Sequence, residues 1–342
     1  MNPEASKSAL EGVDESEVLK SSTPRVSAVV VNWNGEKDLR ASIPSLLDQT
    51  YRRMEVLVVD NGSEDGSMDV VREMGVRWVP LERNYGMAGA LNHGATVSEG
   101  ELLLFLNNDM RFAPDFVAQL VRALMNEPSM FGADALQLDW EGEHVVHAQT
   151  SLRRTKWPHG EIPGWEFAQF SAREPTPCLM GSGANLLVRR EMFEELGGWD
   201  DNYPVGWEDV DLSWRAWMRG WGICHVPTAI CWHRVSASMG SSAGARARRR
   251  GSLSGRLDFS AKFLPWRYVA ATWGLAIAGI VKAIARGSYG GALERAMVVA
   301  ECAFRAPSNF RQRSRMFQEA DTSPGAYWRE TVTRQVSNAQ LS

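Results

Sequence analysis

The chain has 342 residues, of which 44% are hydrophobic and 23% charged, and these values are ordinary for a soluble globular protein. They exclude a disordered, collagen-like or coiled-coil chain, and the length suffices for two domains. The net charge of −4 is uneven, because residues 236–342 carry 16 Lys/Arg against 6 Asp/Glu while the preceding part is acidic. A basic C-terminal region of this kind indicates contact with an anionic surface.

The N-terminal segment 1–24 contains five acids, two lysines and no apolar run, so we expect a disordered tail and no signal peptide. Four cysteines without a CxxC pair favour a reducing, cytoplasmic compartment. The longest uncharged apolar stretch, residues 268–281, has 14 residues, whereas a bilayer span needs about 20. We therefore expect this stretch in a membrane interface or in a core.

Strand and helix patterns alternate from residue 25 onward. Runs rich in Val and Leu predict strands at 26–31, 55–60, 76–80 and 101–107. Apolar residues at helical spacing predict helices at 39–47, 68–74, 87–98 and 116–124. This alternation predicts an α/β fold, Rossmann-like, with a mostly parallel sheet and helices on both faces.

The pattern weakens between about residues 138 and 177, where Trp, Pro, Gly and His accumulate, so binding loops are expected there. Helices at 190–196 and 210–219 and a strand pair near 223–233 then complete a domain that spans 25–235. The region 236–342 is basic and helical, and it loses its pattern beyond Phe317.

Short polar clusters follow three of the predicted strands: Asn32-Trp33-Asn34-Gly35, Asp60-Asn61-Gly62-Ser63-Glu64-Asp65 and Asn107-Asn108-Asp109. Ligands of open parallel sheets bind at the carboxyl ends of strands. One such cluster would mark only a turn, but three in succession suit a nucleotide and a hard cation. The chain has neither a GxGxxG nor a P-loop fingerprint, which argues against a hydride-transfer enzyme or a P-loop kinase.

A dense acidic cluster, Glu208-Asp209-Val210-Asp211, follows Trp207 and opens a predicted helix. Acids in a first turn favour the helix dipole, which is one explanation for the cluster. The other is a general base, because partial burial beside a Trp wall raises the basicity of a carboxylate.

His233 ends the last predicted strand and is either a packed histidine or a metal ligand through its neutral imidazole. The nearby Cys224, His225 and Cys231 do not predict a zinc site, because alternation along strands scatters their side chains between faces.

The motifs VVVNWNG, VVDNGSEDGS, RNYGMAGALNHG, LFLNND and GGWDDNYPVGWEDVDLSWR, followed by the His of CWHR, occur in this order. Together they resemble the family-two glycosyltransferases of the GT-A fold, in particular the bacterial rhamnosyltransferase-like branch, over about residues 26–233. The resemblance implies an inverting transferase in cell-surface glycan synthesis. It would move rhamnose from dTDP-rhamnose to a hydroxyl of a lipid-linked or polysaccharide acceptor, while a hexosyltransferase using a UDP-sugar remains open.

The resemblance also assigns donor-binding roles to six residues: Asn34, Asp60, Asp65, Arg83, Asn84 and Asn107. Asp109 and His233 would hold a divalent cation, Mn²⁺ or Mg²⁺. Asn107 stands where the family has the first Asp of its DxD motif, and a neutral ligand there weakens the attraction for the cation.

In the acidic cluster the resemblance makes Asp209 and Glu208 the catalytic residues, with Asp209 as the base. Trp207 and Asp211 would shape the acceptor pocket.

Two other functions stay open. A sugar-nucleotidyltransferase would need a Gly-rich loop with a basic residue after the first strand, and residues 32–36 offer none. A membrane-associated scaffold with a GT-A-like domain and a weakened metal site is supported only by Asn107.

The basic C-terminal region has two possible partners. Its arginine cluster (Arg246, Arg248, Arg249 and Arg250) and the Trp266 and Trp273 side chains would dock on the inner leaflet of the cell membrane, or its helices would pack on the catalytic domain. A membrane-bound acceptor, which the resemblance implies, favours docking and thus a peripheral protein on the cytoplasmic face. The acidic domain argues against nucleic acid as a partner.

Overall fold

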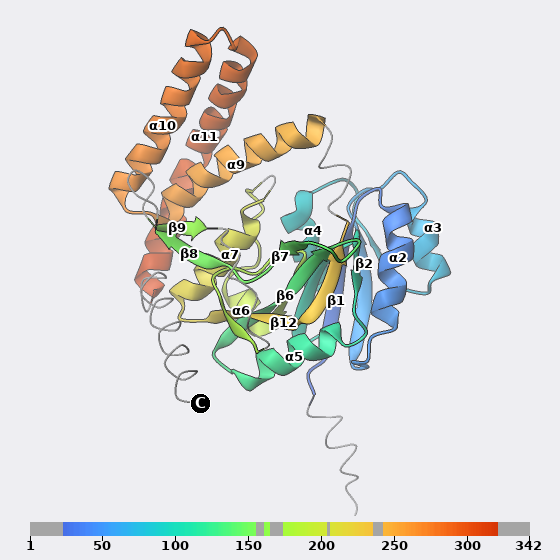
Figure 1. The fold of residues 1–342 in the computed structure, drawn as a ribbon. Helices are drawn as coiled ribbons and strands as arrows, with labels where there is room; N and C mark the ends of the chain where they lie inside the picture. The colour runs from blue at the N-terminus through green and yellow to red at the C-terminus, as the bar shows by residue number, and fades with distance from the viewer. Residues whose placement is uncertain (1–22, 155–160, 165–173, 204–205, 235–241, 321–342) are drawn as a thin grey trace, which may run out of the picture.

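The computed structural model describes residues 23–154, 161–164, 174–203, 206–234 and 242–320 (Figure 1). The predicted disordered tail, apart from its last two residues, and everything beyond residue 320 lie outside this range. The first part of the chain runs through β1 (Val26–Asn32), α2 (Glu36–Leu47), β2 (Met54–Asp60), α3 (Ser67–Glu73), β3 (Arg77–Pro80), α4 (Gly86–Val97), β4 (Leu102–Asn107), β5 (Met110–Phe112) and α5 (Phe116–Asn126). The second part continues through β6 (Met130–Asp139), β7 (Val145–His147), β8 (Ser151–Arg154), β9 (Glu161–Gly164), β10 (Thr176–Cys178), β11 (Asn185–Arg189), α6 (Arg190–Glu195), α7 (Glu208–Met218), β12 (Gly222–His233), α9 (Ser242–Phe263), α10 (Trp266–Ala285) and α11 (Tyr289–Glu319).

The central sheet has the strand order β10-β12-β6-β11-β4-β1-β2-β3. Strands β3, β2, β1 and β4 are parallel, as the alternating pattern predicts. Beyond β4 the sheet is mixed, because β11 runs antiparallel between β4 and β6. In the parallel part Asn32 lies opposite Asp60 and Val31 opposite Asn107, so the polar clusters that follow these strands meet at one edge.

Helices cover both faces of the sheet, as predicted (Figure 1). Successive strand residues point to opposite faces, so β1 contributes to two cores. Ala28 and Val30 pack with α2 and α5 on one face, and Val29 and Val31 pack with α4, α6 and α7 on the other. Leu47, the last residue of α2 and of the predicted helix 39–47, is exposed.

The predicted strand pair near 223–233 is wrong, because β12 is one strand of 12 residues. It runs parallel to β6 and shifts register between Val226 and Ile230. Pro227 in this segment has no N–H to donate to a ladder, so the chain bulges where the sequence reads as a turn. The strand β6 was not predicted, and short strands β7 to β10 occupy the weakly patterned stretch.

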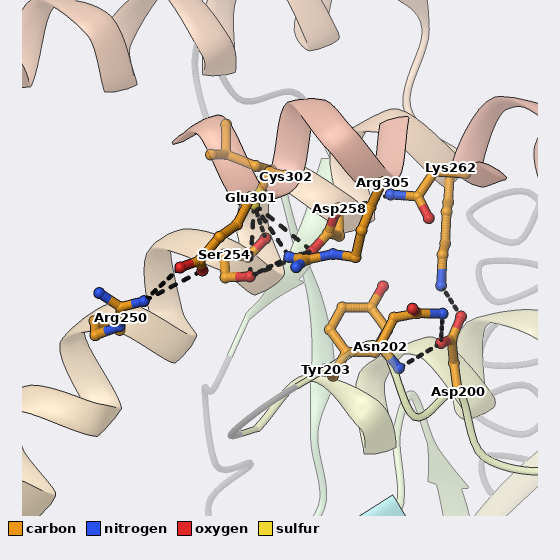
Figure 2. A network of polar contacts seen from close by, with 12 residues as sticks. Asp200, Asn202, Tyr203, Arg250, Ser254, Asp258, Lys262, Glu301, Cys302 and Arg305 are labelled. Atoms are coloured by element: carbon orange, nitrogen blue, oxygen red, sulfur yellow. Dashed lines mark hydrogen bonds and ion pairs between the residues drawn. The ribbon is translucent and has the colours of Figure 1, made fainter. Parts of the chain in front are cut away.

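The C-terminal helices divide into two parts. Phe259 of α9 packs against Trp214 of α7, with ring centroids 5.3 Å apart, so α9 belongs to the core of the α/β domain. The pair α10–α11 projects away from the sheet as a helical hairpin (Figure 1). Polar contacts join α11 to α9, where the Arg305 guanidinium donates to Asp258 at 2.6 Å (Figure 2).

Candidate functional site

The ends of β1 and β2 form one hydrogen-bonded unit. Asn32 Nδ2 donates to Asp60 Oδ1 at 3.0 Å and to Ser63 Oγ at 3.1 Å. The Ser63 N–H donates to Asp60 Oδ2 at 3.1 Å, and Asn108 Nδ2 donates to Asn32 Oδ1 at 2.6 Å. Buried Asn32 and Asp60 therefore tie the loops after three neighbouring strands into one rigid floor.

Asn34 and Asp65, both predicted to bind the donor, brace the rim of this floor. Asn34 has a positive φ of 52°, and its Oδ1 accepts from the Glu64 N–H at 2.8 Å. Asp65 accepts from the N–H groups of Glu36 and Ser67 at 3.0 and 3.1 Å. Burial alone would raise the pKa of Asp65. The two backbone hydrogen bonds and a hydrogen bond from the Ser67 hydroxyl outweigh burial and hold this pKa below its ordinary value.

Asn61 organises the loop that carries Arg83 and Asn84, a role that the sequence did not reveal. Its Nδ2 donates to Asn84 Oδ1 at 3.1 Å, and its Oδ1 accepts from the Tyr85 N–H at 2.8 Å. Gly62 has a φ of +80°, and a Cβ there would lie 2.9 Å from the Arg83 carbonyl carbon. Arg83 and Asn84 are exposed, and the Arg83 guanidinium lies 4.8 Å from the Tyr85 ring centroid.

Asp109 and His233, the predicted metal ligands, lie together at the same end of the sheet. His233 Nε2 is 3.1 Å from Asp109 Oδ1. Gln137 Nε2 donates to Asn185 Oδ1 at 3.1 Å, so Gln137 presents its Oε1 to His233 Nδ1, also at 3.1 Å. Asn185 is held in turn because its Nδ2 donates to the Ala135 carbonyl at 3.0 Å. His233 Nδ1 therefore donates to Gln137, and Nε2 is the ring nitrogen that faces the carboxylate.

A carboxylate oxygen and an imidazole nitrogen at this distance need either a proton or a cation between them, because two lone pairs would repel. Asn107 Oδ1 is buried and, among the described residues, has no hydrogen-bond partner. The carboxylate of Asp109 and the imidazole of His233 are ligand types that Mn²⁺ accepts, and the buried amide oxygen of Asn107, two residues before Asp109, is a further candidate ligand. Within the described part of the chain no group of three or more His, Cys, Asp or Glu is arranged to hold a metal.

The acidic pair at the start of α7 is half-buried. The Val210 N–H donates to Asp209 Oδ1 at 2.8 Å, which orients that carboxylate. Burial raises the pKa of Asp209 to about 6, although the Val210 N–H and nearby His147 both lower it. Burial and the charge of Asp209 together raise the pKa of Glu208 to about 8. Glu208 Oε2 is buried and lacks a hydrogen-bond partner in the described part of the structure.

Trp207 precedes this pair in a left-handed conformation with a φ of 78°. Such a backbone is strained for a bulky residue, and the surrounding packing must hold it. Helix α9 does so, because the Trp207 ring lies 5.6 Å from the Phe259 ring. A Cβ at Gly255 would lie 2.3 Å from the indole, so only glycine admits this contact.

A buried His-Asp-His cluster near Asp209 was missed by the sequence analysis. Asp134 Oδ2 lies 2.9 Å from His147 Nε2 and 3.3 Å from His225 Nδ1. Burial lowers the pKa of His147, but Asp134 and Asp209 raise it above its ordinary value. These residues come from β6, β7 and β12, so no local spacing in the sequence links them.

Asp211, predicted in the acceptor pocket, points instead into a buried ion-pair network, and this corrects the prediction. Its Oδ2 accepts from Lys262 Nζ at 2.9 Å and from the Tyr203 hydroxyl at 3.1 Å, and its Oδ1 accepts from Arg215 Nε at 2.6 Å. Burial raises the pKa of Asp211, but Lys262 and Arg215 hold it below its ordinary value. Lys262 also pairs with Asp200 (Figure 2). The ion pair between Asp211 and Lys262 therefore links α7 to α9.

Comparison with known proteins places this arrangement in a family. Residues 27–197, half of the chain, match Glycosyl transferase family 2. A Mycobacterium tuberculosis protein named N-acetylglucosaminyl-diphospho-decaprenol L-rhamnosyltransferase is 30% identical over 64% of this chain and 78% of its own length. The O-antigen biosynthesis protein RfbC of Myxococcus xanthus is 34% identical, over 63% of this chain and 18% of its own length.

Two solved structures share the fold. GalNAc-T7 with UDP, GalNAc and Mn²⁺ superposes with a TM-score of 0.59 at 18% identity, covering 84% of this chain and 58% of its own. Mannosyltransferase PcManGT from Pyrobaculum calidifontis with GDP-Man and Mn²⁺ gives 0.51 at 17% identity, covering 83% and 87%. The fold is therefore GT-A, with a helical C-terminal region. The chain belongs to glycosyl transferase family 2.

Proposed function

We propose that this glycosyltransferase moves rhamnose from dTDP-rhamnose to a hydroxyl of a lipid-linked acceptor, with inversion, on the cytoplasmic face of the cell membrane. The relative named as a rhamnosyltransferase supports the sugar and the diphospho-decaprenol type of acceptor. The observation that carries the chemistry is the half-buried Asp209, whose pKa of about 6 leaves it ionised but basic at neutral pH.

The donor would lie along the strand-end floor. Asp60 and Asn34 would face the nucleoside, and Arg83 with Asn84 would face the diphosphate, because this exposed loop is fixed by Asn61. Asp109, His233 and Asn107 would hold a divalent cation, which supplies positive charge to the diphosphate as it leaves. Two Mn²⁺-containing structures of the same fold support this cofactor.

Asp209 would take the proton of the acceptor hydroxyl while that oxygen attacks the sugar carbon from the face opposite the diphosphate. One bond forms and one breaks in a single displacement, so the configuration inverts. The Val210 N–H holds the carboxylate in place, and Trp207, the residue before the acidic pair, would form a wall of the acceptor pocket. Glu208, with a pKa raised to about 8, is largely protonated at pH 7 and so leaves Asp209 as the charged partner.

The melting temperature of the purified chain with dTDP, UDP or GDP, each with Mn²⁺ and then with EDTA, tests this assignment. A ligand at about 100 times its Kd contributes roughly 2.7 kcal/mol of stability. We expect a metal-dependent increase with dTDP. An increase with UDP alone would indicate a UDP-linked hexose as the donor in place of dTDP-rhamnose. No increase with any of the three nucleotides would favour the non-enzymatic scaffold function that Asn107 supports.

A further inference from the structure

The α10–α11 hairpin carries a continuous apolar stripe on the solvent side of α11. Large side chains recur there four or seven residues apart, which places them on one helix face: Tyr289, Leu293, Met297 and Phe304. Phe304 is 90% exposed and Tyr289 is 71% exposed. Such a row of aromatic and aliphatic groups in water indicates a surface that another apolar medium covers.

Helix α10 is apolar in the same way. Its most apolar 18-residue window has a mean hydropathy of 1.6, and only 17% of that window is buried. Length and composition would allow it to cross a membrane. Trp266 is exposed at its first position, and the large exposed side chains of its second half are aliphatic, namely Leu275, Ile277, Val281 and Ile284. The hairpin therefore exposes apolar side chains on both of its helices.

The charged residues of α10 and of the turn that follows it are all basic. Residues 263–293 contain three basic residues and no acid, and two of the three lie near the turn of the hairpin. These are Lys282, in the last turn of α10, and Arg286, directly after it, and both are exposed. An apolar surface edged by cations fits the boundary between the acyl chains and the phosphates of an anionic bilayer.

Two acids of α11, Glu294 and Glu301, do not offset this charge, because they pair with the arginine cluster of α9. Glu294 accepts from Arg246 Nε at 3.0 Å, and Glu301 accepts from Arg250 at 2.9 Å. These contacts also engage two of the four arginines that the sequence suggested for lipid binding. The cationic surface is therefore better placed at the turn of the hairpin than on α9.

We propose that the α10–α11 hairpin lies in the interface of an anionic phospholipid bilayer, with its apolar stripes among the acyl chains and Lys282 and Arg286 at the phosphates. This deepens the proposed membrane location and does not depend on the transfer chemistry. A spanning hairpin would carry Glu294, Arg295 and Glu301 of α11 into hydrocarbon, which is unfavourable for each charge. An interfacial position leaves these groups in the polar region.

Flotation of the full chain with lipid vesicles, without nucleotide, tests the proposal. We expect binding to vesicles of 30% phosphatidylglycerol in phosphatidylcholine, and at least tenfold weaker binding by the variant Leu293→Glu/Phe304→Glu. Lys282→Ala and Arg286→Ala should each weaken binding about fivefold at low salt. The matched control Leu47→Glu, at an exposed leucine on α2, should bind like the wild type.

Three results would overturn the proposal: equal binding by the wild type and the double variant, retention of the chain on the membrane after alkaline carbonate extraction, or a wild-type dimer that the double variant disperses in vesicle-free sedimentation. Far-ultraviolet circular dichroism and melting confirm that the variants are folded. The nucleotide-dependent melting shift is measured in the same samples. Loss of that shift with intact flotation would refute the proposed transferase function alone.

Discussion

Helix α7 carries carboxylates on two sides, and among the described residues only the Asp211 side is paired with cationic side chains. Asp209 and Glu208 are half-buried and have no cationic lysine or arginine bonded to them among the described contacts, and their pKa values rise to about 6 and 8. Asp211, two residues on, is fully buried, yet Lys262 and Arg215 hold its pKa below its ordinary value. Counter-ions, more than depth, therefore decide whether a carboxylate on this helix stays charged or gains basicity.

We expect the largest effect, a loss of stability, when the ion pair between Asp211 of α7 and Lys262 of α9 is removed. Lys262→Met removes the buried ammonium from both Asp211 and Asp200, so we expect a loss of about 3 kcal/mol in the free energy of unfolding, measured with urea. The lowered pKa of Asp211 contributes stability above its unfolded pKa, near 4, and this contribution is lost as pH falls through the lower folded value. The wild type and the variant should therefore converge in strong acid.

The matched control is Lys282→Met, which removes an exposed lysine and should leave the free energy of unfolding within about 0.5 kcal/mol of the wild type. A cost below about 1 kcal/mol for Lys262→Met would mean that α9 does not hold α7 through this ion pair.

Asp209, on the side of α7 without a bonded lysine or arginine among the described contacts, should determine the rate of turnover. Asp209→Asn removes the proposed base, so kcat should fall at least about 100-fold while the nucleotide-induced melting shift persists. In the wild type, kcat/KM should rise with pH through about 6, as Asp209 loses its proton, and this rise should be absent in the variant. Initial rates of sugar transfer between pH 5 and 8 measure both effects. Full activity of Asp209→Asn would refute its assignment as base.

The proposed metal site offers a smaller test. Gln137 touches His233 but neither nucleotide nor acceptor in the proposed arrangement, and it fixes the imidazole tautomer. Gln137→Leu should weaken the apparent Mn²⁺ affinity about 10- to 100-fold without lowering kcat at saturating metal. Titration of activity with Mn²⁺ measures this. An unchanged affinity would show that His233 binds no metal or needs no such partner.

The smallest expected effect concerns Glu208. Its raised pKa means that the folded state holds this proton more tightly than the unfolded state, so stability falls as pH rises from about 4.5 toward 8. Glu208→Gln mimics the protonated form and should exceed the wild type by at least about 1 kcal/mol at pH 9 while matching it at pH 4. Urea unfolding at both pH values decides this. A variant less stable than the wild type at pH 9 would contradict the pKa shift.

Local sequence patterns predicted much of the fold. The parallel strands β1 to β4 and their helices follow from runs of apolar residues at regular spacing, and the polar clusters follow from where those runs end. The strand pair at 223–233 failed because Pro227 reads as a turn, whereas pairing with β6 keeps β12 in one sheet. The pairing of two strands that lie far apart in the chain, such as β6 and β12, leaves no pattern in either local sequence.

The order of residues along the chain puts polar side chains at the strand ends, and this accounts for the proposed nucleotide-binding edge and for the likeness to one family. The charge of the acidic side chains depends on contacts that form only in the folded protein. Asp211 is a structural ion-pair partner and not a pocket residue because Lys262 arrives from a helix 51 positions away. Asp134 and His147 act on Asp209 because three strands converge there. Electrostatic environment depends on distances through space, which neighbours along the chain do not set.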